Sequence, residues 1–62
     1  MTAYIQVVDG KMGLVFSPAH ATPMEYKDAE VRQEQAHVQH HELIWEVKSV
    51  GADKYIVMAE RN

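Results

Sequence analysis

The absence of cysteine from a chain of only 62 residues limits how its fold can be held together. A chain of this size buries about 60% of the surface that its unfolded form exposes. The free energy gained from this burial barely exceeds the free-energy cost of the conformational entropy lost on folding. Disulfides and thiolate metal sites, which stabilise many small proteins, both need cysteine. The fold can then be stabilised in three ways: by a well-packed core, by a partner subunit, or by a metal site of histidines and carboxylates. We expect one domain over residues 1–62 that relies on the first two.

Alternating apolar residues predict a β-hairpin at each end of the chain. Residues 3–8 and 11–16 each alternate between two faces, and Asp9-Gly10 between them suits the positive φ angles of a type I′ turn. Residues 43–48 and 55–59 alternate in the same way around a second turn that contains glycine and aspartate. We therefore expect four strands in two hairpins.

The segment between the hairpins predicts one helix over residues 23–40. Thr22 begins the pattern Thr-Pro-Met-Glu, in which the threonine caps free backbone N–H groups and Pro23 takes the first helical position. Glu25 then completes a capping box with Thr22. The element order is ββαββ, which predicts an α+β fold: a four-stranded antiparallel sheet with one helix packed on one face.

The apolar pattern also predicts which residues form the core. The helix contributes only a narrow stripe, so it gains little from packing on the sheet. The predicted core consists of Ile5, Val7, Leu14, Phe16, Leu43, Trp45, Val47, Tyr55 and Val57 from the strands, with Met24, Val31 and Val38 from the helix.

The other sheet face is also rich in apolar residues, and nothing in the chain is expected to cover it. Its members are Tyr4, Val8, Val15, Ile44, Ile56 and Met58. Either they are scattered among polar neighbours, or the face is a contact surface for a protein partner. We favour a contact surface formed by Tyr4, Val15, Ile44, Ile56 and Met58, with a second copy of the chain as a candidate partner. Met12, Met24 and Met58 also suit an adaptable contact surface.

The charge and the apolar runs of the chain argue against nucleic acid and membranes as partners. Its net charge is −3, and no cluster of lysine or arginine is present to follow a phosphate backbone. The longest apolar run, residues 55–59, is far too short to cross a bilayer, and no signal peptide is recognisable at the N-terminus. We therefore expect a cytoplasmic protein that binds neither nucleic acid directly nor a membrane.

Four polar residues of the predicted helix suggest a metal site. Glu30, Glu34, His37 and His41 follow one another at spacings of four, three and four, which places them on one helical stripe. Oxygen and nitrogen ligands of this kind could hold a divalent ion, or respond to pH. The competing interpretation is a solvated helix face. The two interpretations differ in one structural requirement. A metal site needs the helix to continue as far as His41, because the four side chains no longer share one stripe if the helix ends earlier.

No catalytic motif or cofactor site is recognisable in the chain, so we expect a non-enzymatic protein without a cofactor. None of the hydroxyl-bearing residues stands in a nucleophile motif, and the three glycines suit turns rather than a phosphate loop. The leading hypothesis is a small interaction module that associates with itself. The alternatives are a His/carboxylate metal-binding or pH-responsive protein, and an acidic inhibitor that mimics nucleic acid with the six acids between residues 25 and 46.

Overall fold

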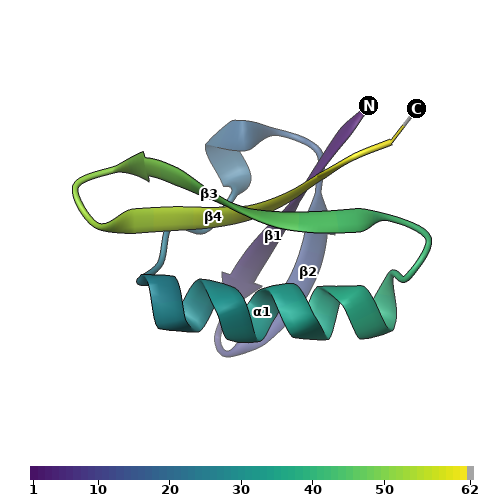
Figure 1. The fold of residues 1–62 in the computed structure, drawn as a ribbon, viewed down its shortest axis with the longest axis horizontal. Helices are drawn as coiled ribbons and strands as arrows, with labels where there is room; N and C mark the ends of the chain where they lie inside the picture. The colour runs from purple at the N-terminus through teal and green to yellow at the C-terminus, as the bar shows by residue number, and fades with distance from the viewer. Residues whose placement is uncertain (62) are drawn as a thin grey trace.

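The computed structural model describes residues 1–61 and confirms the predicted ββαββ order (Figure 1). The elements are β1 (Thr2–Val8), β2 (Lys11–Val15), the short 3-10 helix η1 (Pro18–His20), α1 (Tyr26–Gln39), β3 (Ile44–Gly51) and β4 (Lys54–Glu60). The strands form one antiparallel sheet in the order β2-β1-β4-β3, and α1 packs on one of its faces. No helix in the described part of the chain is long and apolar enough to cross a membrane.

The first hairpin forms as its turn residues predict. Asp9 and Gly10 have φ angles of 51° and 75°, which agree with a type I′ turn. The pairing of β1 with β2 is regular from Tyr4, opposite Val15, to Val8, opposite Lys11. Alternation therefore places Ile5 and Val7 on the face toward the helix, as expected.

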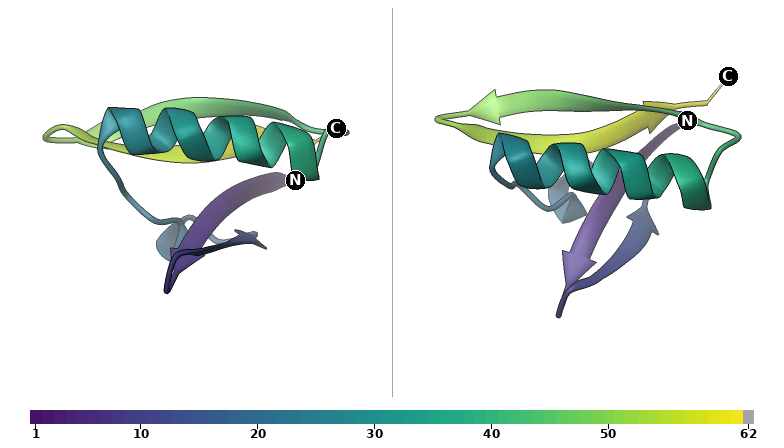
Figure 2. Two further views of the ribbon diagram at one scale, coloured as in Figure 1. Left: turned by 90° about the horizontal axis from the view of Figure 1, so that it is seen from below. Right: turned by 60° about the horizontal axis from the view of Figure 1, so that its bottom comes forward.

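The two hairpins pair with each other only at one end of the sheet. β1 pairs with β4 from Thr2, opposite Glu60, to Tyr4, opposite Met58, and the strands then separate. Figure 2 shows the β1–β2 hairpin turning away from β3 and β4 beyond this point. The sheet is therefore continuous at one end and open at the other.

The connection that precedes α1 occupies the opening between β1 and β4. The Thr22 N–H donates to the Ile5 carbonyl at 3.1 Å, on the β1 side. Two residues later, Met24 and Tyr55 exchange two backbone hydrogen bonds of 2.8 Å each, on the β4 side. The connection thus supplies hydrogen-bond partners that the separated strands no longer supply to each other.

The predicted capping box at Thr22 is wrong. The Thr22 hydroxyl accepts a hydrogen bond of 2.7 Å from the Val7 N–H, so it serves β1 rather than the helix. The bridge between Met24 and Tyr55 keeps this segment extended, and α1 begins only at Tyr26. Glu25 is the N-cap, and its side chain makes no capping hydrogen bond.

The helix packs through a different face from the one predicted. Ala29 and Ala36 are fully buried, whereas Val31 and Val38 are 54% and 78% exposed. The small alanine side chains let α1 lie close to β3 and β4. On this side of α1, the Gln33 amide donates to the Trp45 carbonyl at 2.9 Å. The prediction that the two valines belong to the core is therefore wrong.

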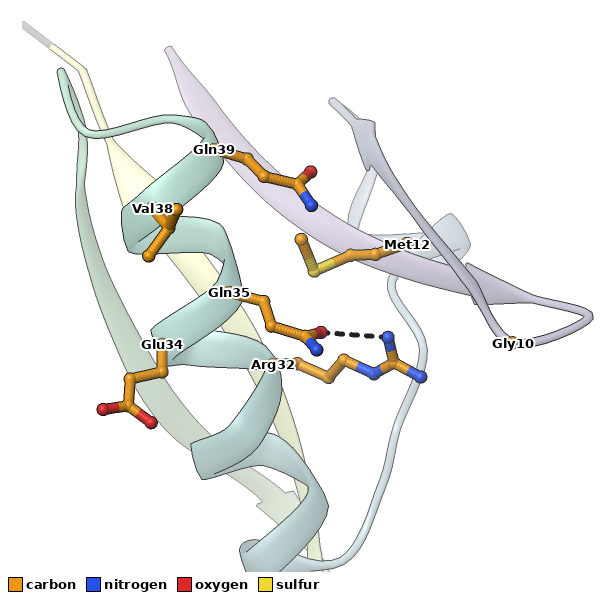
Figure 3. Close-up of a pocket in the computed structure, with 7 residues that line it drawn as sticks. All are labelled: Gly10, Met12, Arg32, Glu34, Gln35, Val38 and Gln39. Atoms are coloured by element: carbon orange, nitrogen blue, oxygen red, sulfur yellow. Dashed lines mark hydrogen bonds between the residues drawn. The ribbon is translucent and has the colours of Figure 1, made fainter.

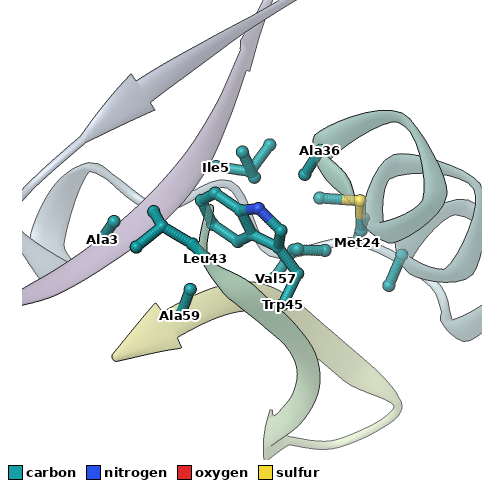
Figure 4. Close-up of a cluster of buried hydrophobic side chains, with 9 residues drawn as sticks. Ala3, Ile5, Met24, Ala36, Leu43, Trp45, Val57 and Ala59 are labelled. Carbon is teal, nitrogen blue, oxygen red and sulfur yellow. The ribbon is translucent and has the colours of Figure 1, made fainter. Parts of the chain in front are cut away.

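Trp45 lies at the centre of the buried cluster (Figure 4). Its indole N–H donates to the His40 carbonyl at 3.2 Å, so the buried ring has no unsatisfied polar atom. The predicted core residues that are buried are Ile5, Met24, Leu43, Trp45 and Val57, and those partly buried are Val7, Leu14, Val47 and Tyr55. Phe16 is 56% exposed because β2 ends before it, so its assignment to the core is wrong.

We expect Thr22→Val to lower the free energy of unfolding by about 1–2 kcal/mol, because it leaves the partly buried Val7 N–H without an acceptor. Urea unfolding followed by far-UV circular dichroism measures this change. Thr22→Ser keeps the hydroxyl and is the matched control. Equal stability of the valine and serine variants would contradict the assigned role.

We expect Ala36→Leu to lower the free energy of unfolding by about 1–3 kcal/mol, because a larger side chain has no space between α1 and the sheet. Val38→Ala, two residues away on the exposed side, is expected to change it by less than about 0.5 kcal/mol. Thermal unfolding of the two variants compares the helix faces directly. A larger effect at Val38 than at Ala36 would mean that the helix is rotated from the position described.

Candidate functional site

A groove separates α1 from the β1–β2 hairpin. Two adjoining cavities, of about 500 and 540 Å3, lie between these elements and share Gly10, Arg32 and Gln35 in their walls. We call this feature the helix–hairpin groove. Its apolar lining is Val7 and Met12 from the hairpin, Met24 from the connection, and Val31 and Val38 from α1.

The groove follows from the way in which the sheet opens. The helix packs mainly against β3 and β4, while the hairpin turns away from them (Figure 2). Val7 and Met12 pack against the core cluster but remain only partly buried. The groove therefore leaves part of the Val7 and Met12 side chains uncovered by the rest of the chain.

Arg32 places a positive charge in the groove. Its Nη1 donates to the Gln35 side-chain oxygen at 3.0 Å, and the Met12 side chain lies close by on the hairpin (Figure 3). Within residues 1–61, the only contact of 4.0 Å or less between a lysine, arginine or histidine nitrogen and a side-chain carboxylate joins His40 and Glu42. The Arg32 guanidinium therefore has a neutral amide partner and no carboxylate at salt-bridge distance.

The predicted metal-ligand stripe is only partly formed. Glu30, Glu34 and His37 lie on α1 at the expected spacing and are exposed. The helix ends at Gln39, and His41 lies in the following turn, away from the regular helix. In the part of the chain that the structure describes, no group of three or more histidines and carboxylates is placed to hold a metal ion.

The predicted contact face of the sheet is more closed than expected. Ile56 is only 7% exposed, and Tyr4, Val15 and Met58 are half-buried. The short helix η1 contacts β1 on the side of the sheet away from α1 (Figure 1). Ile44, at 75% exposure, is the one member of the five whose side chain is mostly free. Contact through this face would therefore depend mainly on Ile44 and its edge strand.

Sequence reasoning did not identify Arg32 or the exposed valines as site residues. The helix–hairpin groove depends on the angle between the two hairpins, and no local pattern encodes that angle. Two signals were nevertheless present. The stripe of Val31 and Val38 was too narrow for a buried helix face, and Met12 suited a contact surface.

Comparisons of the chain with protein-family models, with curated proteins and with solved structures find no match. The groove and the rest of the described surface are therefore the features that bear on function.

We expect Zn²⁺ to bind this protein weakly and without a defined site. Zinc in proteins takes three or four ligands in a tetrahedral arrangement, and His41 lies outside the helix that carries Glu34 and His37. Addition of Zn²⁺ to tag-free protein, followed by imidazole and amide NMR, should give small shifts spread over all four histidines. Tight, saturable shifts confined to the predicted stripe would contradict this expectation.

Proposed function

We propose that this chain is a non-enzymatic interaction module that holds an apolar segment of a partner protein in the helix–hairpin groove. The observation that carries the proposal is the combination of an apolar lining with one guanidinium that has no carboxylate at salt-bridge distance. Met12 and the exposed Val31 and Val38 supply the apolar part, and Arg32 supplies the positive charge. The cavity walls also contain the carboxylates of Asp28 and Glu34, neither of which lies at salt-bridge distance from Arg32. We place the module in the cytoplasm, in keeping with its lack of cysteine.

Val31 and Val38 provide exposed apolar surface that a bound partner segment would bury. Val31 and Val38 are seven residues apart on α1, so they lie two turns apart along one side of the helix. Full burial of a valine side chain contributes about 1.5 kcal/mol or more. A segment lying along α1 would cover both valines and would also contact Met12 across the groove.

Arg32 favours a partner that carries a carboxylate. A guanidinium binds a carboxylate through paired hydrogen bonds that are stronger than bonds between neutral groups. The side-chain amide of Gln35, which accepts the hydrogen bond from Arg32 in the free protein, is neutral, and a carboxylate of a partner could replace it. The best partner is therefore a segment with apolar side chains and an acidic group, from either an acidic residue or a chain terminus.

The polar groups of the groove suit recognition better than catalysis. Arg32, Gln35 and Gln39 bring a guanidinium and amides, and Asp28 and Glu34 each bring a carboxylate to the cavity walls. Within residues 1–61, no hydroxyl donates a hydrogen bond to either of these two carboxylates, so no nucleophile–base pair is formed in the groove. The Thr22 hydroxyl, in the second cavity, already accepts a hydrogen bond from Val7. Both cavities are open rather than enclosed, which suits the side chains of a passing polypeptide.

Selection of short random linear peptides displayed on phage against the immobilised protein tests the proposal. We expect the enriched peptides to combine apolar residues with at least one carboxylate, and their NMR shifts to map to Met12, Val31 and Val38. Arg32→Gln should weaken their binding about tenfold or more, because it removes a charged hydrogen-bond partner.

Two further variants locate the interaction. Val38→Lys should abolish peptide binding, since it puts a charge on the groove wall. Ile44→Lys is the matched control, because it makes the same kind of change at an exposed apolar residue of β3 outside the groove. Peptides without a preference for carboxylates, or shifts that map to β3, would refute the groove as the binding site.

A further inference from the structure

The strand β3 lies at an edge of the sheet and has one unpaired side. The sheet order β2-β1-β4-β3 leaves β3 paired only with β4. The Tyr55 N–H and carbonyl both bond to Met24, so they point away from β3. Backbone groups alternate along an antiparallel strand, and the next residue, Ile56, therefore bonds toward β3.

The same alternation identifies which groups of β3 face outward. Ile56 is paired with Lys48, and Met58 with Glu46, so these β3 residues bond to β4. Trp45, Val47 and Ser49 then direct their N–H and carbonyl groups to the open edge. The Gln33 side chain, which reaches the Trp45 carbonyl from outside the sheet, agrees with this assignment. Within residues 1–61, no hydrogen bond satisfies the outward groups of Val47 and Ser49.

We propose that this open edge pairs with β3 of a second copy of the chain, antiparallel and centred on Val47. The two sheets would then form one continuous sheet around a two-fold axis. In this register Val47 lies opposite Val47 of the partner subunit, and the two residues exchange both backbone hydrogen bonds. Trp45 lies opposite Ser49 of the partner subunit, and its carbonyl has a second lone pair beside the one that Gln33 uses.

The charges on the strand select this register. Glu46 and Lys48 are both exposed and share the sheet face opposite α1. The register centred on Val47 places Glu46 opposite Lys48 of the partner subunit, and the two-fold axis repeats the pair. No other antiparallel register pairs these two residues, and a parallel in-register arrangement would place like charges together. Opposite charges across strands stabilise pairing, and like charges oppose it.

The ends of the edge support the same arrangement. Ile44 is 75% exposed and Val50 is 50% exposed, and the proposed register places each opposite the other. The β-bulge between Ser49 and Gly51 ends the regular edge at this point. The paired segment is therefore bounded by two exposed apolar residues, which association would bring together.

This edge lies outside the helix–hairpin groove. The groove contacts the side of α1 that carries Val31 and Val38, whereas the edge adjoins Gln33 and Trp45. Association through β3 therefore goes beyond the proposed groove function and does not depend on it. A dimer would carry two grooves, and a partner with two binding segments would gain affinity from both.

Charge reversal on β3 tests the proposal. We expect the wild type to show a monomer–dimer equilibrium by sedimentation equilibrium at concentrations up to about 1 mM. Glu46→Lys alone and Lys48→Glu alone each create two like-charge pairs across the interface, and each should weaken self-association about tenfold or more. An equimolar mixture of the two variants should restore the dimer as a heterodimer, because every pair then has opposite charges.

Two proline variants test the backbone pairing. Val47→Pro removes an N–H that points outward, so it should abolish the dimer and leave the monomer folded by far-UV circular dichroism. Glu46→Pro removes an N–H that bonds to β4 and should unfold the chain. Val38→Lys, in the groove, should leave the dimer unchanged, which separates this proposal from the proposed function.

Three results would overturn the proposal. The first is a wild type that stays monomeric up to about 1 mM, as expected if Glu46 and Lys48 only protect the edge from association. The second is a dimer that persists in Val47→Pro. The third is a mixture of the two charge variants that associates no better than either variant alone.

Discussion

The hydrogen bonds of the segment from Thr22 to Met24 determine how the two hairpins are arranged. One end of this segment bonds to Ile5 and Val7 in β1, and the other exchanges two backbone bonds with Tyr55 in β4. These contacts hold open a sheet whose central strands pair at only one end. A closed sheet would leave this connection without backbone partners, and buried or partly buried N–H groups need them.

The position of the helix follows from this arrangement. The chain enters α1 from the β4 side, so the helix lies over β3 and β4 rather than over the middle of the sheet. The alanines Ala29 and Ala36 allow a close approach, and Trp45 fills the space between the sheet and the helix. The His40 carbonyl accepts hydrogen bonds from the Trp45 indole and from the Leu43 N–H, which fastens the end of the helix to the start of β3.

The same placement gives the helix two different flanks. On one side, the groove exposes Met12, Val31 and Val38 around the charge of Arg32. On the other side, Gln33 reaches the edge of β3, where Val47 and Ser49 have free backbone groups. One surface offers side-chain recognition and the other offers strand pairing. A small chain can combine the two because the groove lies between α1 and the β1–β2 hairpin, whereas strand pairing uses backbone groups of the edge strand β3.

The sequence by itself determined the local structure of this protein. Period-two alternation and Asp9-Gly10 specify the hairpins, and the α+β order follows from them, because these signals depend only on neighbouring residues. Most predicted strand core residues are buried or partly buried for the same reason.

Only the tertiary structure decided the role of Thr22, the buried face of the helix and the position of His41. A hydroxyl that caps a helix and one that bonds to a strand look alike in sequence, and Val7 is fifteen residues away. Val31 and Val38 resemble core residues until the alanines are seen to face the sheet. The groove lies where α1 and the β1–β2 hairpin approach each other, and the open edge lies where β3 has no neighbouring strand. Both depend on contacts between segments that are far apart in the chain, and no local sequence pattern predicts such contacts.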